Sequence, residues 1–250
     1  MSAPLHDRVA IVTGGAKGIG RAVCARLAEL GAAIGIIDMD AEGAARAAAE
    51  LPRAVSVAAD VADYGDVRAA VGAILDAFGR VDVLVNNAGW DRIQPFLEND
   101  PEVWDRLIGV NLRGVFNVTH VAVPHLIEAG GGRVVNIASD AGRVGSSGEA
   151  VYSACKGGVI AFTKTLAREV ARKGVTVNCV CPGPTDTALL DEIRGAESGQ
   201  KIIDAIVRAT PVGRLAQPED IAAAVAFFAT APGHVTGQVL SVSGGLTMAG

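Results

Sequence analysis

The sequence predicts a single doubly wound α/β domain, in which helices cover both faces of a parallel β-sheet. Short segments rich in β-branched residues alternate along the whole chain with longer segments of helical pattern, which is typical of this fold class. The short segments are mostly apolar on both faces, as expected for strands that helices cover on each side. No linker, repeat or low-complexity stretch divides the chain, so one domain is expected over residues 1–250.

The expected strands are short runs of mostly Val, Ile and Ala, and the last residues of several of them are polar. In chain order they are Val9–Thr13, Ala33–Asp38, Ala54–Ala59, Val81–Val85, Arg133–Ile137, Val175–Val180 and Val239–Val242. Because ligands of open α/β sheets bind beyond the carboxyl ends of the strands, the residues just after each strand are the candidates for function.

The expected helices lie between these strands. They are Ile19–Leu30, which Gly31 ends; an alanine-rich helix to about Leu51; Tyr64–Phe78; a long region from Pro101 to Ala129 with a break between its halves; the helix that carries Tyr152 and runs to Lys173; Leu189–Ala209; and Pro218–Ala229. Small and polar residues interrupt the segment after Pro182. Residues 186–210 are therefore expected to leave the sheet, either as a lid or as a solvated loop.

Composition and charge exclude several classes of protein. Half of the residues are hydrophobic, 20% are charged and the formal net charge is −5, with no cluster of Lys and Arg, which argues against a nucleic-acid partner. The first residues lack the basic and apolar parts of a signal peptide. No apolar run reaches the roughly 18 residues of a membrane span, so a cytoplasmic protein with no membrane partner is expected.

The cysteines and histidines do not suggest a metal site. The chain has four of each, without a C-x-x-C pair or a His/Cys cluster. Cys179 and Cys181 share one face of an expected strand, and buried reduced thiols are the simplest interpretation of all four cysteines.

A glycine-rich turn, Thr13–Gly20, follows the first strand and opens the first helix. Glycines let the backbone turn tightly and approach a pyrophosphate, whose charge is met by the helix N-terminus. The expected contacts to a dinucleotide here are Gly14, Lys17, Gly18, Ile19 and Gly20.

Asp38 ends the second strand, where a carboxylate accepts hydrogen bonds from the adenosine ribose. It would repel a 2′-phosphate, so NAD is expected as the cofactor in preference to NADP. Lys17 argues the other way, because a cation in the glycine turn could pair with that phosphate. The alternative role for Asp38 is a cap for the helix that begins near Asp40.

Two further strand ends carry candidates for cofactor contact. Asp60 and Val61 close the third strand, where an acid can accept from the adenine amino group. The small residues after the fourth strand let the backbone approach a flat ring, which adds Asn87, Ala88 and Gly89.

Tyr152 and Lys156 are four residues apart on an expected helix, so both groups share one face. A free tyrosine has a pKa of about 10, and a nearby lysine cation lowers the pKa of a phenol, so the pair could move a proton to or from an alcohol. The alternative is a solvated helix face. Ser139 follows the fifth strand, where its hydroxyl can donate to a substrate carbonyl. A hydrolase nucleophile is the competing role for Ser139, but the sequence offers neither a G-x-S-x-G elbow nor an evident histidine base.

With the Thr-Gly-x-x-x-Gly-Ile-Gly turn, Asn-Asn-Ala-Gly, Tyr-x-x-x-Lys and a later Pro-Gly in this order, the chain resembles the short-chain dehydrogenases/reductases over its whole length. The resemblance implies a Rossmann-type fold with seven parallel strands and a homotetramer. It also implies a catalytic tetrad of Asn111, Ser139, Tyr152 and Lys156, in which Tyr152 is the general acid/base and Lys156 holds the nicotinamide ribose. Residues implied to line the nicotinamide are Pro182, Gly183, Thr185 and Thr187.

Four segments resemble the branch of this family that oxidises an alicyclic β-hydroxyacyl-CoA to its ketone. They are Asn87–Asp91, Ser139–Tyr152, Val180–Leu190 and Gly237–Met248. The resemblance implies an acyl-CoA as the small-molecule substrate. Reduction of 3-oxoacyl thioesters is the alternative within the family, and a non-catalytic dinucleotide-binding redox sensor is the alternative of another class. Trp90, Asp91, Asp140 and Arg143 are the positions expected to bear on substrate choice.

Overall fold

The computed structural model of the protein contains one seven-stranded sheet in which all strands are parallel. The structure describes residues 3–187, 190 and 199–249. The strands lie in the order β3-β2-β1-β4-β5-β6-β7, so the chain winds outward in both directions from β1 and β4. Their bounds are β1 Val9–Thr13, β2 Ala33–Asp38, β3 Ala54–Ala58, β4 Val83–Asn86, β5 Gly132–Ile137, β6 Val175–Pro182 and β7 Val239–Val242. The predicted single-domain, doubly wound parallel fold is confirmed.

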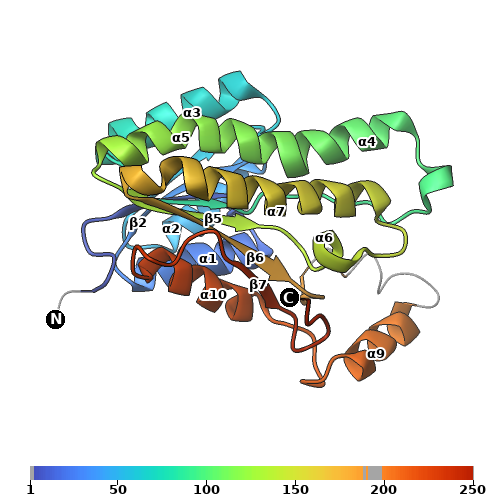
Figure 1. Cartoon of the computed structure of the whole chain (residues 1–250). Coiled ribbons are helices and arrows are strands. Elements are labelled where there is room, and N and C mark those ends of the chain that lie inside the picture. Colours follow the sequence, from blue (N-terminus) through green and yellow to red (C-terminus); the bar gives the residue numbers. More distant parts are fainter. Residues whose placement is uncertain (1–2, 188–189, 191–198, 250) are drawn as a thin grey trace.

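Helices form a layer on each face of this sheet (Figure 1). Their bounds are α1 Gly18–Glu29, α2 Ala41–Ala49, α3 Tyr64–Phe78, α4 Pro101–Ile108, α5 Gly114–Glu128, α6 Ala141–Val144, α7 Ala150–Val170, α9 Gly199–Ala209 and α10 Pro218–Thr230. Short 3₁₀ turns cover Phe96–Glu98 and Ala171–Lys173. Helices α1, α2 and α10 pack on one face, and α3, α5 and α7 pack on the other.

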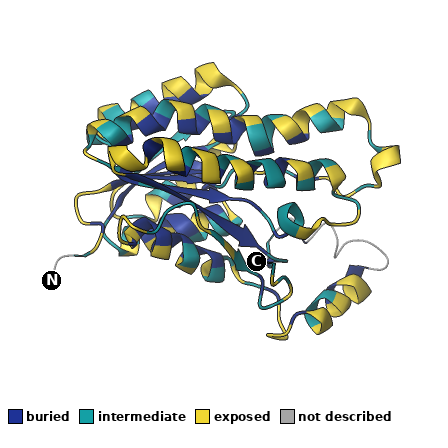
Figure 2. Ribbon diagram, in the orientation of Figure 1, coloured by how far each residue is buried: buried dark blue, intermediate teal, exposed yellow. Residues whose placement is uncertain are grey.

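Each central strand is covered by helices on both faces of the sheet, which explains why its sequence is mostly apolar. In β1, Ala10 and Val12 belong to the core under α1 and α10, whereas Val9 and Ile11 belong to the core under α3 and α5. Successive strand side chains point to opposite faces, so a strand covered on both sides needs apolar residues at every position. The central strands β1, β2, β4, β5 and β6 are accordingly the most deeply buried elements (Figure 2), whereas the edge strands β3 and β7 are mostly half-buried.

The break expected between Pro101 and Ala129 is a stretch of π-helix over Gly109–Arg113, between α4 and α5. Asn111 is fully buried in it, and its side-chain amide donates to the carbonyl oxygen of Leu107 at 3.0 Å. Single π-turns inside helices are frequent at functional sites. The π-helical stretch therefore turns the Asn111 side chain toward the interior.

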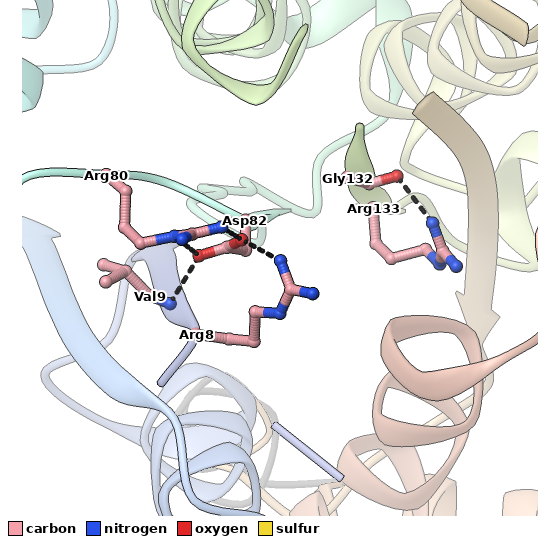
Figure 3. A network of polar contacts seen from close by, with 6 residues as sticks. All are labelled: Arg8, Val9, Arg80, Asp82, Gly132 and Arg133. Carbon is pink, nitrogen blue, oxygen red and sulfur yellow. Dashed lines mark hydrogen bonds and ion pairs between the residues drawn. The ribbon is translucent and has the colours of Figure 1, made fainter. Parts of the chain in front are cut away.

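At the amino ends of the strands, Asp82 joins the start of β1 to the turn before β4 (Figure 3). It is 4% exposed and accepts from Arg8 Nη1 at 2.6 Å, from Arg80 Nη2 at 2.6 Å and from the backbone amide of Val9 at 3.0 Å. Burial acts to raise the pKa of Asp82, but these donors outweigh it and hold that pKa below its ordinary value. Close by, Arg133 donates to the carbonyl oxygen of Gly132 at 3.0 Å. This edge is opposite the strand ends that carry the candidate site.

The region after β6 is described in part. Of the helix expected over 189–209, residues Gly199–Ala209 form α9, which lies beyond the ends of β6 and β7 (Figure 1). Leu190, Ile203 and Leu215 form a small apolar cluster of their own. Residues 188–189 and 191–198 lie outside the described residues, so the lid over 186–210 stays a prediction. Among the helices of the described segments, none is long and apolar enough to cross a membrane.

Candidate active site

The parallel sheet brings the candidate residues to one edge. Strand β1 ends at Thr13, β2 at Asp38, β4 at Asn86, β5 at Ile137 and β6 at Pro182. In-register pairing of these strands places their carboxyl ends side by side. The glycine turn, Asp38, the Asn-Asn-Ala-Gly segment, Ser139 and the Pro-Gly segment therefore surround one region.

The glycine turn is held against the end of β4 by hydrogen bonds that the sequence motif alone does not show. The Asn87 side-chain amide donates to the carbonyl oxygens of Thr13 and Gly14, both at 3.0 Å. In return, Thr13 Oγ1 accepts from the backbone amides of Asn87 and Ala88 at 3.0 Å. Gly14 has a φ of +66°, and a Cβ on it would lie 2.8 Å from Ala88 Cα, so only glycine fits. Thr13 was not predicted as a site residue, although its position between β1 and the first glycine of the turn favoured such a role.

Asp38 links β2 to the glycine turn. Its Oδ2 accepts from the backbone amide of Ala16 and its Oδ1 from that of Asp40, both at 2.9 Å. Helix α2 is capped by Asp40 itself, whose Oδ1 accepts from Gly43 N at 2.8 Å. The alternative role of Asp38 as the cap of α2 is therefore wrong. Lys17 is exposed at the start of α1.

The remaining cofactor candidates also lie along this edge. Asp60 Oδ1 accepts from Ala62 N at 2.9 Å, and Val61 is buried next to it. Thr185 Oγ1 donates to the carbonyl oxygen of Gly183 at 2.9 Å. A Cβ on Gly18 would lie 3.5 Å from Thr187 Cγ2, so the segment after β6 reaches back to the glycine turn.

The tetrad predicted from the family resemblance lies around the start of α7. Lys156 is 3% exposed, and its Nζ donates to the carbonyl oxygen of Ile137 at 3.0 Å and lies 5.5 Å from the centre of the Tyr152 ring. Ser139 Oγ accepts from Ala141 N at 3.1 Å, and its hydroxyl is hydrogen-bonded to that of Tyr152. The Asn111 amide donates to the carbonyl oxygen of Trp90 at 2.6 Å. A Cβ on Gly89 would lie 3.1 Å from Asn111 Oδ1 and 3.6 Å from Lys156 Nζ, so both side chains approach this backbone.

The electrostatics of the tyrosine differ from the expectation. Burial raises the pKa of Tyr152 above its ordinary value, and the charges of Asp91 and Glu149 raise it further, while the bond to Ser139 lowers it. The role predicted for Lys156, to bring this pKa down, stays a prediction. Burial lowers the pKa of Lys156 itself to about 8, and the ammonium faces the Ile137 carbonyl rather than the phenol oxygen.

Two acidic residues adjoin the tyrosine. Asp91 is 4% exposed, and Glu149 precedes the first residue of α7. Asp91 was singled out from the sequence, but Glu149 was missed. The signal for Glu149 was its position three residues before Tyr152, which puts it one helical turn away.

Arg143 and Asp140, two of the positions considered for substrate choice, contact the C-terminal segment. Arg143 Nη1 donates to Ser241 Oγ at 2.8 Å and its Nη2 donates to the carbonyl oxygen of Ala249. Ser241 Oγ donates to Asp140 Oδ1 at 2.5 Å. The acceptors that Arg143 meets here are thus a hydroxyl and a backbone carbonyl oxygen, both of them neutral.

A buried polar ladder lies below Ser139 and was also missed. Asn86 Nδ2 donates to Thr119 Oγ1 at 2.9 Å and to Asn136 Oδ1 at 2.8 Å, and Asn136 Nδ2 donates to Thr163 Oγ1 at 2.9 Å. The ladder joins α5, β4, β5 and α7. In the sequence, only the polar residues at interior positions of the strands indicated this ladder.

The thiols are buried and free, and the Sγ atoms of Cys179 and Cys181 lie 4.0 Å apart on one face of β6. Over the ranges 3–187, 190 and 199–249, no group of three or more His, Cys, Asp or Glu residues is placed to hold a metal ion.

Comparison with known proteins gives relatives over nearly the full length. Residues 8–198 match the family model described as short chain dehydrogenase. The chain is 42% identical to a (2S)-[(R)-hydroxy(phenyl)methyl]succinyl-CoA dehydrogenase subunit of Thauera aromatica, with 98% of each chain covered. It is 41% identical to an acetoacetyl-CoA reductase of Allochromatium vinosum, covering 96% of this chain and 99% of the other.

A solved structure shows that the similarity to this family extends to the three-dimensional fold. The 3-ketoacyl-(acyl-carrier-protein) reductase of Brucella melitensis, complexed with NADH, superposes with a TM-score of 0.91 at 37% identity, covering 98% of this chain and all of that one. The family match, the full-length relatives and the fold agree. The chain therefore belongs to the short-chain dehydrogenase family of oxidoreductases.

Proposed function

We propose that the protein transfers hydride reversibly between NAD and the β-carbon of an acyl-CoA, interconverting 2-hydroxycyclohexanecarboxyl-CoA and 2-ketocyclohexanecarboxyl-CoA. The observation that carries this proposal is the placement of Tyr152, hydrogen-bonded to Ser139, at the sheet edge that also bears the glycine turn and Asp38. Hydride transfer to or from an alcohol needs a group that exchanges a proton and a binding site for a dinucleotide, and this edge of the sheet offers both.

The residues at this edge fit a dinucleotide. A Cβ on Gly20 would overlap the carbonyl oxygen of Gly14, so the turn keeps its backbone open to a pyrophosphate at the start of α1. Asp38 uses one lone pair of each oxygen on backbone amides, which leaves acceptor capacity for ribose hydroxyls. Its negative charge disfavours a 2′-phosphate and supports NAD over NADP. Asp60 and Val61 are proposed to contact the adenine, and Pro182, Gly183, Thr185 and Thr187 the nicotinamide.

When bound, NAD accepts or supplies the hydride. In the oxidation direction, the Tyr152 oxygen takes the proton of the substrate hydroxyl, and Ser139 donates a hydrogen bond to the oxygen that becomes the ketone. Lys156 is proposed to hold the nicotinamide ribose and, when charged, to favour the phenolate. Asn111 fixes the backbone at Trp90 and is proposed to support the water relay behind Lys156.

An acyl-CoA substrate is supported by the names of two relatives, which act on a substituted succinyl-CoA and on acetoacetyl-CoA. Reduction of an acyl-carrier-protein thioester is the second candidate, favoured by the fold match with the Brucella melitensis enzyme. Asp38 supports NAD as the cofactor for either candidate, because the Brucella melitensis reductase is itself complexed with NADH.

The test is a spectrophotometric NADH assay with purified protein on four substrate classes: cyclic β-hydroxyacyl-CoAs, linear β-hydroxyacyl-CoAs, the matching free acids and simple alcohols. We expect the highest kcat/KM for the cyclic CoA thioester. Higher kcat/KM for an acyl-carrier-protein substrate with NADPH would support the second candidate instead.

The same preparation distinguishes an enzyme from a redox sensor. NADH binding measured by fluorescence, without turnover on any substrate, would support the sensor and contradict the proposal. The homotetramer and the cytoplasmic location stay predictions, and the mass of the protein in solution tests the first.

A further inference from the structure

Asp91 is a buried acid without a cationic partner of its own among the described residues. It is 4% exposed, and its Oδ1 accepts from the backbone amide of Arg92 at 2.7 Å. No N–H or O–H donor of the described residues reaches its Oδ2, which is also buried. A buried carboxylate oxygen with no donor is costly, so a proton on Oδ2 is the simplest way to satisfy it.

Glu149 is placed to accept that proton in a hydrogen bond. The chain segment that follows Asp91 is held beside Glu149, because Gln94 N donates to the carbonyl oxygen of Gly148 at 2.9 Å, and Glu149 is the more exposed of the two acids. Burial, together with the bond to Glu149 and its charge, raises the pKa of Asp91 to about 7, while Arg92 N and the Lys156 charge act in the opposite direction. Two carboxyl groups in contact cannot both ionise easily, so near neutral pH the pair holds one proton.

The groups around Asp91 indicate that this proton affects the ionisation of Tyr152. The charged or titratable side chains acting on Asp91 are Glu149 and Lys156, and Asp91 and Glu149 in turn both act on Tyr152. On α4, Arg106 is stacked 4.1 Å over the ring of Trp90, with its charge directed at that ring. Asn111 fixes Trp90 through two backbone bonds, at 2.6 and 3.3 Å, and so holds Asp91 in place.

We infer that Asp91 and Glu149 form a carboxyl pair that shares one proton and, through its charge, sets the pH range in which Tyr152 can accept a proton. Below neutral pH the pair carries one negative charge. Once the shared proton leaves, the pair carries two, and the phenolate of Tyr152 becomes harder to form. Both acids thus act through Tyr152 as positioning residues, and the inference rests on the proposed role of Tyr152.

Asp91→Asn and Glu149→Gln test this inference because each removes one charge from the pair and keeps its shape. In the oxidation direction, kcat/KM rises with pH as Tyr152 loses its proton. We expect both variants to move this rise to lower pH by about 1 unit. Glu102→Gln, an exposed acid on α4, is the control and should leave the profile in place. A merely structural role would lower kcat/KM by the same factor at every pH, and that result would overturn the inference.

A second measurement does not depend on turnover. Infrared difference spectra of the wild-type protein should show the carbonyl band of a protonated carboxylic acid that disappears as pH rises through about 7, as the pKa of Asp91 requires. The band should be missing in Asp91→Asn. If the band is present while Tyr152→Phe retains full activity, the carboxyl pair stands and the proposed role of Tyr152 fails. Absence of the band in the wild-type protein would overturn the inference whatever the activity.

Discussion

The ammonium nitrogen of Lys156 lies 5.5 Å from the centre of the Tyr152 ring and donates to the carbonyl oxygen of Ile137 at 3.0 Å. One turn of α7 puts both side chains on one face, as their spacing predicts. Burial of Lys156 lowers its pKa to about 8, so the lysine exchanges its proton close to neutral pH. The cation beside the phenol is therefore one whose charged form burial disfavours.

Tyr152→Phe should remove most of the activity and leave NADH binding unchanged. The phenol oxygen is the only group proposed to exchange the substrate proton, and a general acid/base contributes about 10²–10⁴-fold in rate. Steady-state kinetics and NADH fluorescence titration measure the two effects. Tyr64→Phe is the matched control, because Tyr64 is the other tyrosine of the chain, is 44% exposed and bonds His120 at 2.9 Å. Near-normal turnover of Tyr152→Phe would contradict its role.

Asp38→Ala should relax the choice between NAD and NADP. Removal of the carboxylate takes away the ribose acceptor and the repulsion of a 2′-phosphate, so kcat/KM with NAD should fall by about 10-fold while kcat/KM with NADP rises. Asp40→Ala is the control: it removes a neighbouring acid that caps α2 and should leave the cofactor ratio unchanged. A wild-type protein that already prefers NADPH would refute the NAD assignment.

Asn136→Leu should lower the free energy of unfolding by about 1–3 kcal/mol, because it removes one of the two buried bonds of Asn86 Nδ2 and the bond that Asn136 donates to Thr163 Oγ1. Urea denaturation measures the change. The double variant Asn86→Leu/Asn136→Leu should cost less than the sum of the single changes, since the two amides share one bond. Additive losses would show that the ladder does not act as a unit.

Asp82→Asn should destabilise the fold by on the order of 2 kcal/mol at neutral pH, because it weakens three charge-assisted bonds. The folded pKa of Asp82 lies below its ordinary value. Its contribution is therefore fully present above the unfolded pKa of about 4 and is lost as pH falls below it through the folded pKa.

Thermal unfolding of the wild type and of Asp82→Asn against pH measures this contribution. The difference in stability should be constant from pH 7 to about 5 and shrink below about 4. Glu50→Gln, in an exposed pair with Arg21, should cost less than about 1 kcal/mol. A stability difference that does not change in acid would contradict the assigned role of Asp82.

Much of the fold was predictable because its signals are local. Runs such as Val9–Thr13 are apolar at every position, which identifies strands buried on both faces. The spacing of Tyr152 and Lys156 and the glycines of the turn follow from helix and turn geometry over a few residues. The bounds were less certain: β4 begins at Val83 and β6 continues to Pro182, because strand ends depend on pairing with neighbouring strands.

The sequence by itself determined the sheet, the glycine turn with Asp38, and the order of the tetrad residues. Tertiary structure alone decided that Asn87 ties the glycine turn to β4, that Asn86 and Asn136 form a buried ladder, and that Asp91 contacts Glu149. It also decided the direction of the Tyr152 pKa, which burial and the charges of Asp91 and Glu149 raise. The physical reason is that hydrogen bonds, burial and Coulomb energies depend on distances between residues far apart in the chain, and no local pattern encodes those distances.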